Sequence, residues 1–226
     1  MSGILTLSKL KSSAREYLLG MNKRRFPELF GVTDGKAVGT FVEHAFHKHL
    51  QAYYHYQAGS SASGIDFPKL EVDLKVTSIR QPQSSCPYKS ASQKVYGLGY
   101  HLLVFVYDKQ DDPRKKSAHL NFQHAIFVNR EYTSDFQTTQ GLIGILERSG
   151  NKDDIVAFLE ERNLPLDEIG RDQLAERILR EPPKPGCLTI SNALQWRLQY
   201  GRIVSIAAKG GNEGVENLLG SRGESS

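Results

Sequence analysis

The sequence predicts an α/β fold, and three stretches of the chain support that prediction. Apolar and charged residues alternate over residues 70–76, which is the pattern of a strand with one face toward a core. Residues 101–107 form a continuous apolar run, typical of a strand buried on both faces, and residues 125–128 are a further strand. Residues 38–53 repeat apolar side chains at the spacing of an amphipathic helix. Strands with helices between them favour an α/β core.

Composition limits the classes of protein to which the chain can belong. Its 226 residues suffice for one domain with a small insertion, and 39% hydrophobic content is ordinary for a globular protein. No apolar run approaches the roughly 20 residues that cross a bilayer, and no signal peptide opens the chain, so we expect no membrane contact and a cytoplasmic location. Cys86 and Cys187 are too few for a disulfide framework or a thiolate zinc site. A net charge of +4 is compatible with a polyanionic partner but does not establish one.

The strand over residues 70–76 contains candidate catalytic residues. Its apolar face, expected to meet the core, holds Leu70, Val72, Leu74 and Val76, and its opposite face holds Glu71, Asp73 and Lys75. Asp66 lies just upstream, where the chain turns and can fold back beside that row. Two carboxylates hold a hard cation such as Mg²⁺, and an adjacent lysine can orient or deprotonate a water or offset charge on a phosphate. The pattern favours a metal-dependent phosphodiesterase site; the alternative is a surface ion pair on a solvent-facing edge.

The preceding helix offers a further acid. Asp34-Gly35 is a turn signal before it, and its predicted buried stripe is Val38, Phe41, Val42, Ala45, Phe46, His49, Leu50 and Tyr53. Glu43 lies at the border of that stripe, where a carboxylate is costly unless a cation or donor meets it. We interpret Glu43 as an additional acid of the site; the alternative is a side chain that extends past its neighbours to solvent. The spacing of His44, His47, His49 and His55 does not put them on one face, so they are predicted to be surface or packing residues.

A polar loop follows the strand and is expected to contact DNA, because Arg, Gln and Ser read base edges or bind phosphates. The predicted contacts in this loop and the short helix after it are Arg80, Gln81, Gln83, Ser84, Ser85, Tyr88, Lys89 and Lys94. The alternative is a plain connecting loop.

The rest of the chain is expected to extend this core, which with the N-terminal helices occupies residues 1–150. Residues 151–186 read as a helical insertion, a helix pair that favours a packing unit or dimer contact over a helix-turn-helix reader. Residues 187–208 read as strands returning to the core, where Arg197 and Arg202 with Gln195 and Gln199 make a polar face for nucleic acid or, equally, a solvent-facing hairpin edge. Residues 209–226 are Gly-, Glu- and Ser-rich and are expected to be disordered.

Asp66, the Asp73-Leu74-Lys75 triplet and Glu43 on the preceding helix together resemble the motif of the PD-(D/E)xK nucleases, and among them the type II restriction endonucleases. The resemblance covers about residues 34–130, with Ile65 standing where the family usually has proline and a short interval between Asp66 and Asp73. It implies a restriction-endonuclease-like core with a mixed central sheet flanked by helices. It also implies metal ligands at Asp66, Asp73 and the backbone carbonyl of Leu74, a catalytic lysine at Lys75 and a helper acid at Glu43.

The function implied by this resemblance is Mg²⁺-dependent, sequence-specific cleavage of double-stranded DNA by a homodimer that cuts both strands of a palindrome. Two alternatives stay open: a structure-directed repair or junction-resolving nuclease, and a non-catalytic DNA-binding protein with a nuclease-like fold. The intact set of two acids and a lysine argues against the non-catalytic alternative.

Overall fold

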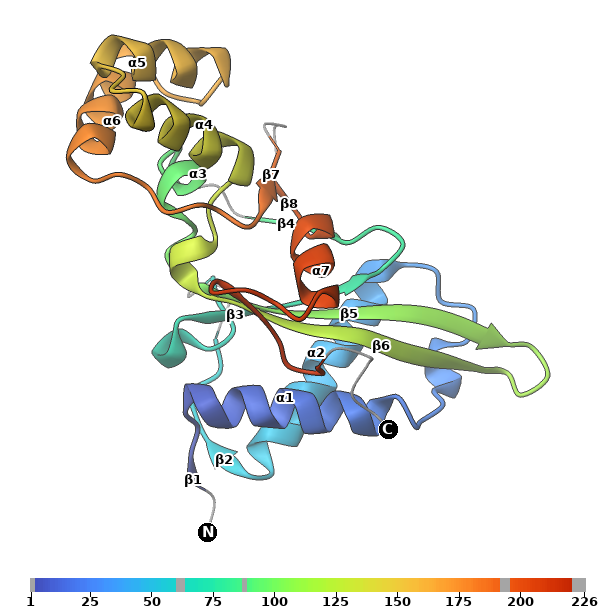
Figure 1. The fold of residues 1–226 in the computed structure, drawn as a ribbon. Helices are drawn as coiled ribbons and strands as arrows, with labels where there is room; N and C mark the ends of the chain where they lie inside the picture. Colours follow the sequence, from blue (N-terminus) through green and yellow to red (C-terminus); the bar gives the residue numbers. More distant parts are fainter. Residues whose placement is uncertain (1–2, 60–63, 87–88, 192–195, 221–226) are drawn as a thin grey trace.

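A four-stranded mixed sheet forms the centre of the computed structural model, which describes residues 3–59, 64–86, 89–191 and 196–220 (Figure 1). Its strands are β3 (Val72–Ser78), β5 (His101–Asp112), β6 (Ser117–Val128) and β9 (Val215–Asn217), in the order β3-β5-β6-β9. β3 runs parallel to β5, whereas β5 with β6 and β6 with β9 are antiparallel. β3 is therefore an edge strand of this sheet, and the edge that does not pair with β5 is available to other groups.

Two helices, α1 (Leu7–Met21) and α2 (Gly35–Gln51), cover one face of the sheet (Figure 1). Asp34 caps α2 by accepting a hydrogen bond from the Lys36 N–H at 2.9 Å. The predicted apolar stripe is confirmed along this helix, where the fully buried members are Val38, Val42, Phe46 and Leu50; Tyr53 lies beyond the helix and is exposed. The short strands β1 (Gly3–Ile4) and β2 (Tyr54–His55) pair beside these helices.

A small antiparallel sheet and helix α7 (Gly201–Ala208) cover the opposite face. The small sheet has the order β4-β8-β7, with β4 at Gln83–Ser85, β7 at Thr189–Ile190 and β8 at Arg197–Gln199. Alternate residues of β5 pack toward the two layers: Leu103 and Phe105 toward α1 and α2, Leu102 and Val104 toward α7. The prediction of a strand buried on both faces is therefore confirmed.

A helical unit projects from one end of the sheet and has its own apolar core (Figure 1). It contains α3 (Gln93–Tyr96), α4 (Phe136–Glu147), α5 (Lys152–Glu161) and α6 (Glu168–Arg180). Leu142 of α4 is fully buried in the same cluster as Ile155 and Ile178. The unit thus includes α3 and α4, both of which lie before the predicted boundary at residue 151. No helix in the described part of the chain is both long enough and apolar enough to span a membrane.

Three local predictions are wrong. Residues 201–208 form α7 rather than a strand, because Ile203 and Ala207 are four residues apart and bury one helical face. Residues 209–220 are ordered: β9 extends the central sheet, and the Leu218 N–H donates to the Ala125 carbonyl at 2.7 Å. Residues 221–226 lie outside the described part of the chain. Glu71 precedes β3 in a left-handed conformation (φ 53°) and pairs with Arg130, so it does not join the row of Asp73 and Lys75.

Candidate active site

Asp66 lies in the loop before β3 and is held against that strand. The Leu74 N–H donates to Oδ2 of Asp66 at 2.8 Å, and the chain turns through paired backbone hydrogen bonds between Phe67 and Val72. The N–H and C=O of one strand residue point to the same side of the strand. The Leu74 carbonyl is therefore directed to the same free edge of β3 as the Asp66 carboxylate. The loop acid and the strand come together here, as the sequence led us to expect.

Asp73 and Lys75 form an ion pair on β3, with 2.7 Å between the Lys75 Nζ and Oδ2 of Asp73. The Asp73 side chain is 4% exposed. Burial raises the pKa of Asp73 to about 7; Lys75 opposes that shift, and the neighbouring Asp66 adds to it. Burial also acts to raise the pKa of Asp66, but His47, a hydrogen bond with Asp73 and the Leu74 N–H together lower it. The two carboxyl groups therefore titrate as a pair, in which Asp73 binds a proton more readily than Asp66.

The surrounding acids keep Lys75 charged. Burial acts to lower the pKa of Lys75, but Asp73, then Asp66 and Glu43, raise it above its usual value. Glu43 reaches the cluster from α2, and burial followed by repulsion from Asp66 raises its pKa. The site thus combines three acids and one ammonium group drawn from a helix, a loop and a strand.

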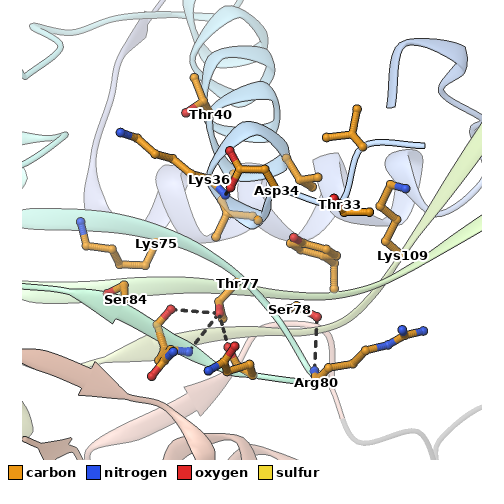
Figure 2. A pocket seen from close by; sticks show the side chains of 18 of the residues that line it. Thr33, Asp34, Lys36, Thr40, Lys75, Thr77, Ser78, Arg80, Ser84 and Lys109 are labelled. Carbon is orange, nitrogen blue, oxygen red and sulfur yellow. Dashed lines mark hydrogen bonds between the residues drawn. The ribbon is translucent and has the colours of Figure 1, made fainter. Parts of the chain in front are cut away.

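A groove of about 1010 Å³ opens beside this cluster, between the first turns of α2 and the end of β3 (Figure 2). Glu43 and Lys75 line it, and so do most of the predicted DNA contacts: Arg80, Gln81, Gln83, Ser84, Ser85 and Arg197. The Thr77 hydroxyl fixes the loop between β3 and β4, because the Gln83 N–H donates to it at 3.1 Å. The polar loop therefore forms one wall of the groove.

The small sheet gives that wall a regular polar face. Gln83 of β4 lies opposite Gln199 of β8, and Ser85 lies opposite Arg197. Residues directly opposite one another in an antiparallel pair share a face. Ser85, Arg197 and Gln199 are exposed, whereas Leu198, on the other face, is fully buried. We call Gln83, Ser85, Arg197 and Gln199 the polar sheet face.

Several predicted contacts lie elsewhere. Arg202 does not share a face with Arg197, because α7 begins directly after β8; its guanidinium lies 3.2 Å from the ring centroid of Phe136, beside a separate cavity of about 370 Å³. Lys94 is 4% exposed, with its Nζ 5.9 Å from the ring centroid of Trp196. Lys89 is exposed but does not line the groove. Tyr88 and Gln195 fall outside the described residues.

Other residues at the site carried no clear signal in the sequence. The groove is also lined by Thr33 just before α2, by Lys36 and Thr40 within α2, and by Lys109 of β5 (Figure 2). His47 was predicted to be a surface or packing residue, yet its Nε2 lies 3.8 Å from Oδ1 of Asp66. Its position one helical turn after Glu43 was the only hint, since residues four apart share a helix face.

Comparisons with known proteins give the family. The profile of the family described as type II restriction enzyme NspV matches residues 4–217. A type II restriction enzyme NspV from Nostoc sp. (strain ATCC 29411 / PCC 7524) is 56% identical over 206 residues, which cover 91% of this chain and 94% of that relative. No solved structure matches the chain. The chain therefore belongs to the type II restriction enzyme NspV family, and it is a restriction endonuclease, a site-specific deoxyribonuclease.

Proposed function

We propose that this enzyme hydrolyses phosphodiester bonds of double-stranded DNA with Mg²⁺, as a PD-(D/E)xK nuclease whose catalytic cluster is Asp66, Asp73, Lys75 and Glu43. One observation carries the proposal. Asp66 is tied to β3 through the Leu74 N–H at 2.8 Å, and Asp73 meets Lys75 at 2.7 Å, so two carboxylates and an ammonium converge beside a groove.

The donor set at this point suits a hard cation. In the described part of the chain, no three or more His, Cys, Asp or Glu side chains gather as a metal site. A cation bound here would take oxygen atoms from Asp66, Asp73 and the Leu74 carbonyl, with water and phosphate completing its shell, which is the coordination that Mg²⁺ prefers. The raised pKa of Asp73 also supports this fit, because burial beside Asp66 disfavours the charged carboxylate and a bound cation would stabilise it.

The chain's own groups have separate tasks in the proposed reaction. Bound Mg²⁺ supplies Lewis-acid chemistry to the phosphate and to the attacking water. Lys75 orients that water and offsets charge on the phosphate; its raised pKa favours this role over that of a base. Glu43 helps to hold the Lys75 ammonium from across the groove.

The groove walls are the proposed DNA contacts. The polar sheet face has the chemistry of direct base readout, since Arg pairs with guanine and Gln with adenine in the major groove. Arg80, Gln81 and Ser84 lie beside it, and Lys36 and Lys109 provide positive charge for phosphates along the groove. Lys94 and Arg202 are not part of this proposed surface, because one is buried and the other stacks on Phe136.

A homodimer completes the proposal. Two copies related by a twofold axis present two identical sites, which matches the twofold symmetry of a palindrome and permits cleavage of both strands. Sedimentation should then give twice the chain mass of 25.3 kDa. The same proposal places the enzyme in the cytoplasm, where a restriction enzyme meets invading DNA.

Cleavage of phage and plasmid DNA tests the proposal. With Mg²⁺ the protein should yield discrete fragments whose mapped ends share one sequence, and chelation of the metal should stop cleavage. Discrete fragments that form equally well in excess chelator would contradict the metal-dependent mechanism. Ends that share no sequence would contradict the proposed base readout.

A further inference from the structure

The imidazole of His47 is locked in place by aromatic side chains. It stacks on Phe67 with 5.0 Å between ring centroids and a 19° interplanar angle, and on Tyr56 at 6.0 Å and 25°. Phe67 is 1% exposed and directly follows Asp66 in the chain. The ring therefore has a fixed orientation beside the loop that carries Asp66.

Both ring nitrogens of His47 face a polar group. Nδ1 lies 2.8 Å from the Tyr56 hydroxyl, and Nε2 lies 3.8 Å from Oδ1 of Asp66. Burial, then the charge of Asp66, raises the pKa of Tyr56 to about 12, so its hydroxyl keeps its proton. With the Nε2–H directed at Asp66, Nδ1 of the neutral ring accepts from the Tyr56 O–H, which also lies 3.3 Å from the His47 backbone carbonyl. At 3.8 Å the Nε2 and Oδ1 atoms are within ion-pair distance.

Asp66 needs such support more than Asp73 does. Asp73 is fixed by the hydrogen bonds of β3 in a sheet, whereas Asp66 lies in a loop and only its Oδ2 is held by the Leu74 N–H. Among the described residues, His47 is the side chain within ion-pair distance of Oδ1. Without it, the Leu74 N–H and the Asp73 carboxyl group are the hydrogen-bond partners left to orient the Asp66 carboxylate.

We propose that His47 is a positioning residue that fixes the Asp66 carboxylate in the orientation in which it binds the divalent cation together with Asp73. This inference rests on the proposed function. His47 acts through Asp66 and not on the ion, because Nδ1 is occupied by Tyr56 and the Nε2 hydrogen faces a carboxylate. The chain of contacts runs from Tyr56 through His47 to Asp66, in the manner of the outer-shell partners that orient metal ligands.

Binding of Mn²⁺ to the full-length protein without DNA tests the inference, measured by isothermal titration calorimetry. His47→Phe keeps a flat ring between Tyr56 and Phe67 but removes both nitrogens; we expect Mn²⁺ affinity to fall about 10-fold or more. His47→Gln places an amide N–H near the position of Nε2 and should recover most of that loss. The matched control is His49→Phe, because His49 contacts Tyr17 and Tyr53 and should bind Mn²⁺ as the wild type does.

Cleavage kinetics give a second readout. A positioning defect should raise the Mg²⁺ concentration needed for half-maximal cleavage while saturating Mg²⁺ restores most of the wild-type rate. Wild-type Mn²⁺ affinity in His47→Phe would overturn the inference and leave the proposed function standing, as would an equal loss in His47→Gln and His47→Phe. Absence of Mn²⁺ binding in the wild type itself would instead overturn the proposed function.

Tyr56→Phe decides the question if His47→Phe does not fold. It removes only the hydroxyl that faces Nδ1, so the stacked ring of His47 remains. We expect a several-fold loss of Mn²⁺ affinity, smaller than the loss caused by substitution of His47 itself. Unchanged affinity in this variant would contradict the proposed chain of contacts.

Discussion

The acid cluster and the polar sheet face lie beside the same groove but differ in how their charges are solvated. Asp73 is 4% exposed at its side chain and its charge is balanced by Lys75 at 2.7 Å. Arg197 and Gln199 are two residues apart on β8 and both are exposed. Water therefore screens their electrostatic interactions. In the cluster each group controls the pKa of the others, so one substitution should disturb all of them. On the sheet face each side chain should act almost independently.

The largest expected effect is that of Asp73→Ala. Loss of this carboxylate removes a proposed ligand and leaves the partly buried Lys75 without its ion-pair partner. We expect cleavage to fall by three orders of magnitude or more, equivalent to about 4 kcal/mol, while DNA affinity stays close to that of the wild type. Single-turnover cleavage and gel-shift assays measure the two quantities separately. A fully active Asp73→Ala protein would end the assignment of the site.

Lys75→Ala should reduce cleavage by about two orders of magnitude, the usual cost of one electrostatic contact to a transition state. Since Lys75 opposes the raised pKa of Asp73, its loss should also raise that pKa further. NMR titration of the Asp73 carboxyl carbon checks the second effect. An Asp73 pKa that falls in the variant would contradict the coupling that distinguishes the cluster from the sheet face.

Arg197→Ala tests the sheet face. Removing one proposed base contact should weaken binding to the recognition sequence by about 1–3 kcal/mol and reduce discrimination at one base pair. The cleavage rate at saturating DNA should change little. Lys152→Ala is a suitable control, because Lys152 pairs with Asp172 in the helical unit, away from the groove. Equal losses on specific and random DNA would assign Arg197 to a phosphate instead of a base.

Acid–base linkage provides a prediction specific to the cluster. The folded pKa of Asp73, about 7, lies above the value of about 3.9 in an unfolded chain, so the folded state binds the extra proton. Its contribution to stability is complete below about pH 4 and is lost as pH rises through 7. The pKa of Asp66 is lowered in the folded state, so this residue stabilises the fold above its unfolded pKa. That stability is lost only in acid, below the pH range over which Asp73 titrates.

The metal-free protein should therefore lose stability between pH 5.5 and 8, and Ca²⁺ should restore it. We expect the rise in Tm on adding Ca²⁺ to be about 3–5 °C larger at pH 8 than at pH 5.5. Scanning calorimetry measures both values, and Asp73→Asn should remove the difference between them. A Ca²⁺ effect that is independent of pH would show that Asp73 does not exchange its proton for the ion.

The smallest effect is expected at Lys36, across the groove from the sheet face. Lys36→Ala should weaken binding of all DNA sequences alike and reduce the slope of log affinity against log salt by about one. Fluorescence anisotropy at several salt concentrations measures that slope. An effect confined to the recognition sequence would place Lys36 with the base-reading residues instead.

The parts predicted correctly from the sequence are those that depend on local periodicity. The alternation in residues 70–76 placed Asp73 and Lys75 together on one face, and the helical stripe placed Glu43 beside them. The misplaced or missed groups depend on contacts between distant segments. His47 lies beside Asp66 where Phe67 and Tyr56 pack around its ring, and Arg202 leaves the sheet because α7 begins at Gly201, just after β8 ends.

The tail illustrates the same limit. Its Gly-, Glu- and Ser-rich composition indicates disorder, yet Val215 and Leu218 find buried positions against β6 and the core. Amino-acid composition does not show whether a short segment will lie beside a strand whose backbone hydrogen-bonding groups are unpaired. Only the assembled sheet supplies that partner.

Crystals soaked in Mn²⁺ test the central claim most directly, through anomalous scattering. We predict one peak at the end of the groove, within about 2.0–2.5 Å of a carboxylate oxygen of Asp66, one of Asp73 and the Leu74 carbonyl. An empty cluster at Mn²⁺ concentrations that support cleavage, or a peak held by other side chains, would contradict the account.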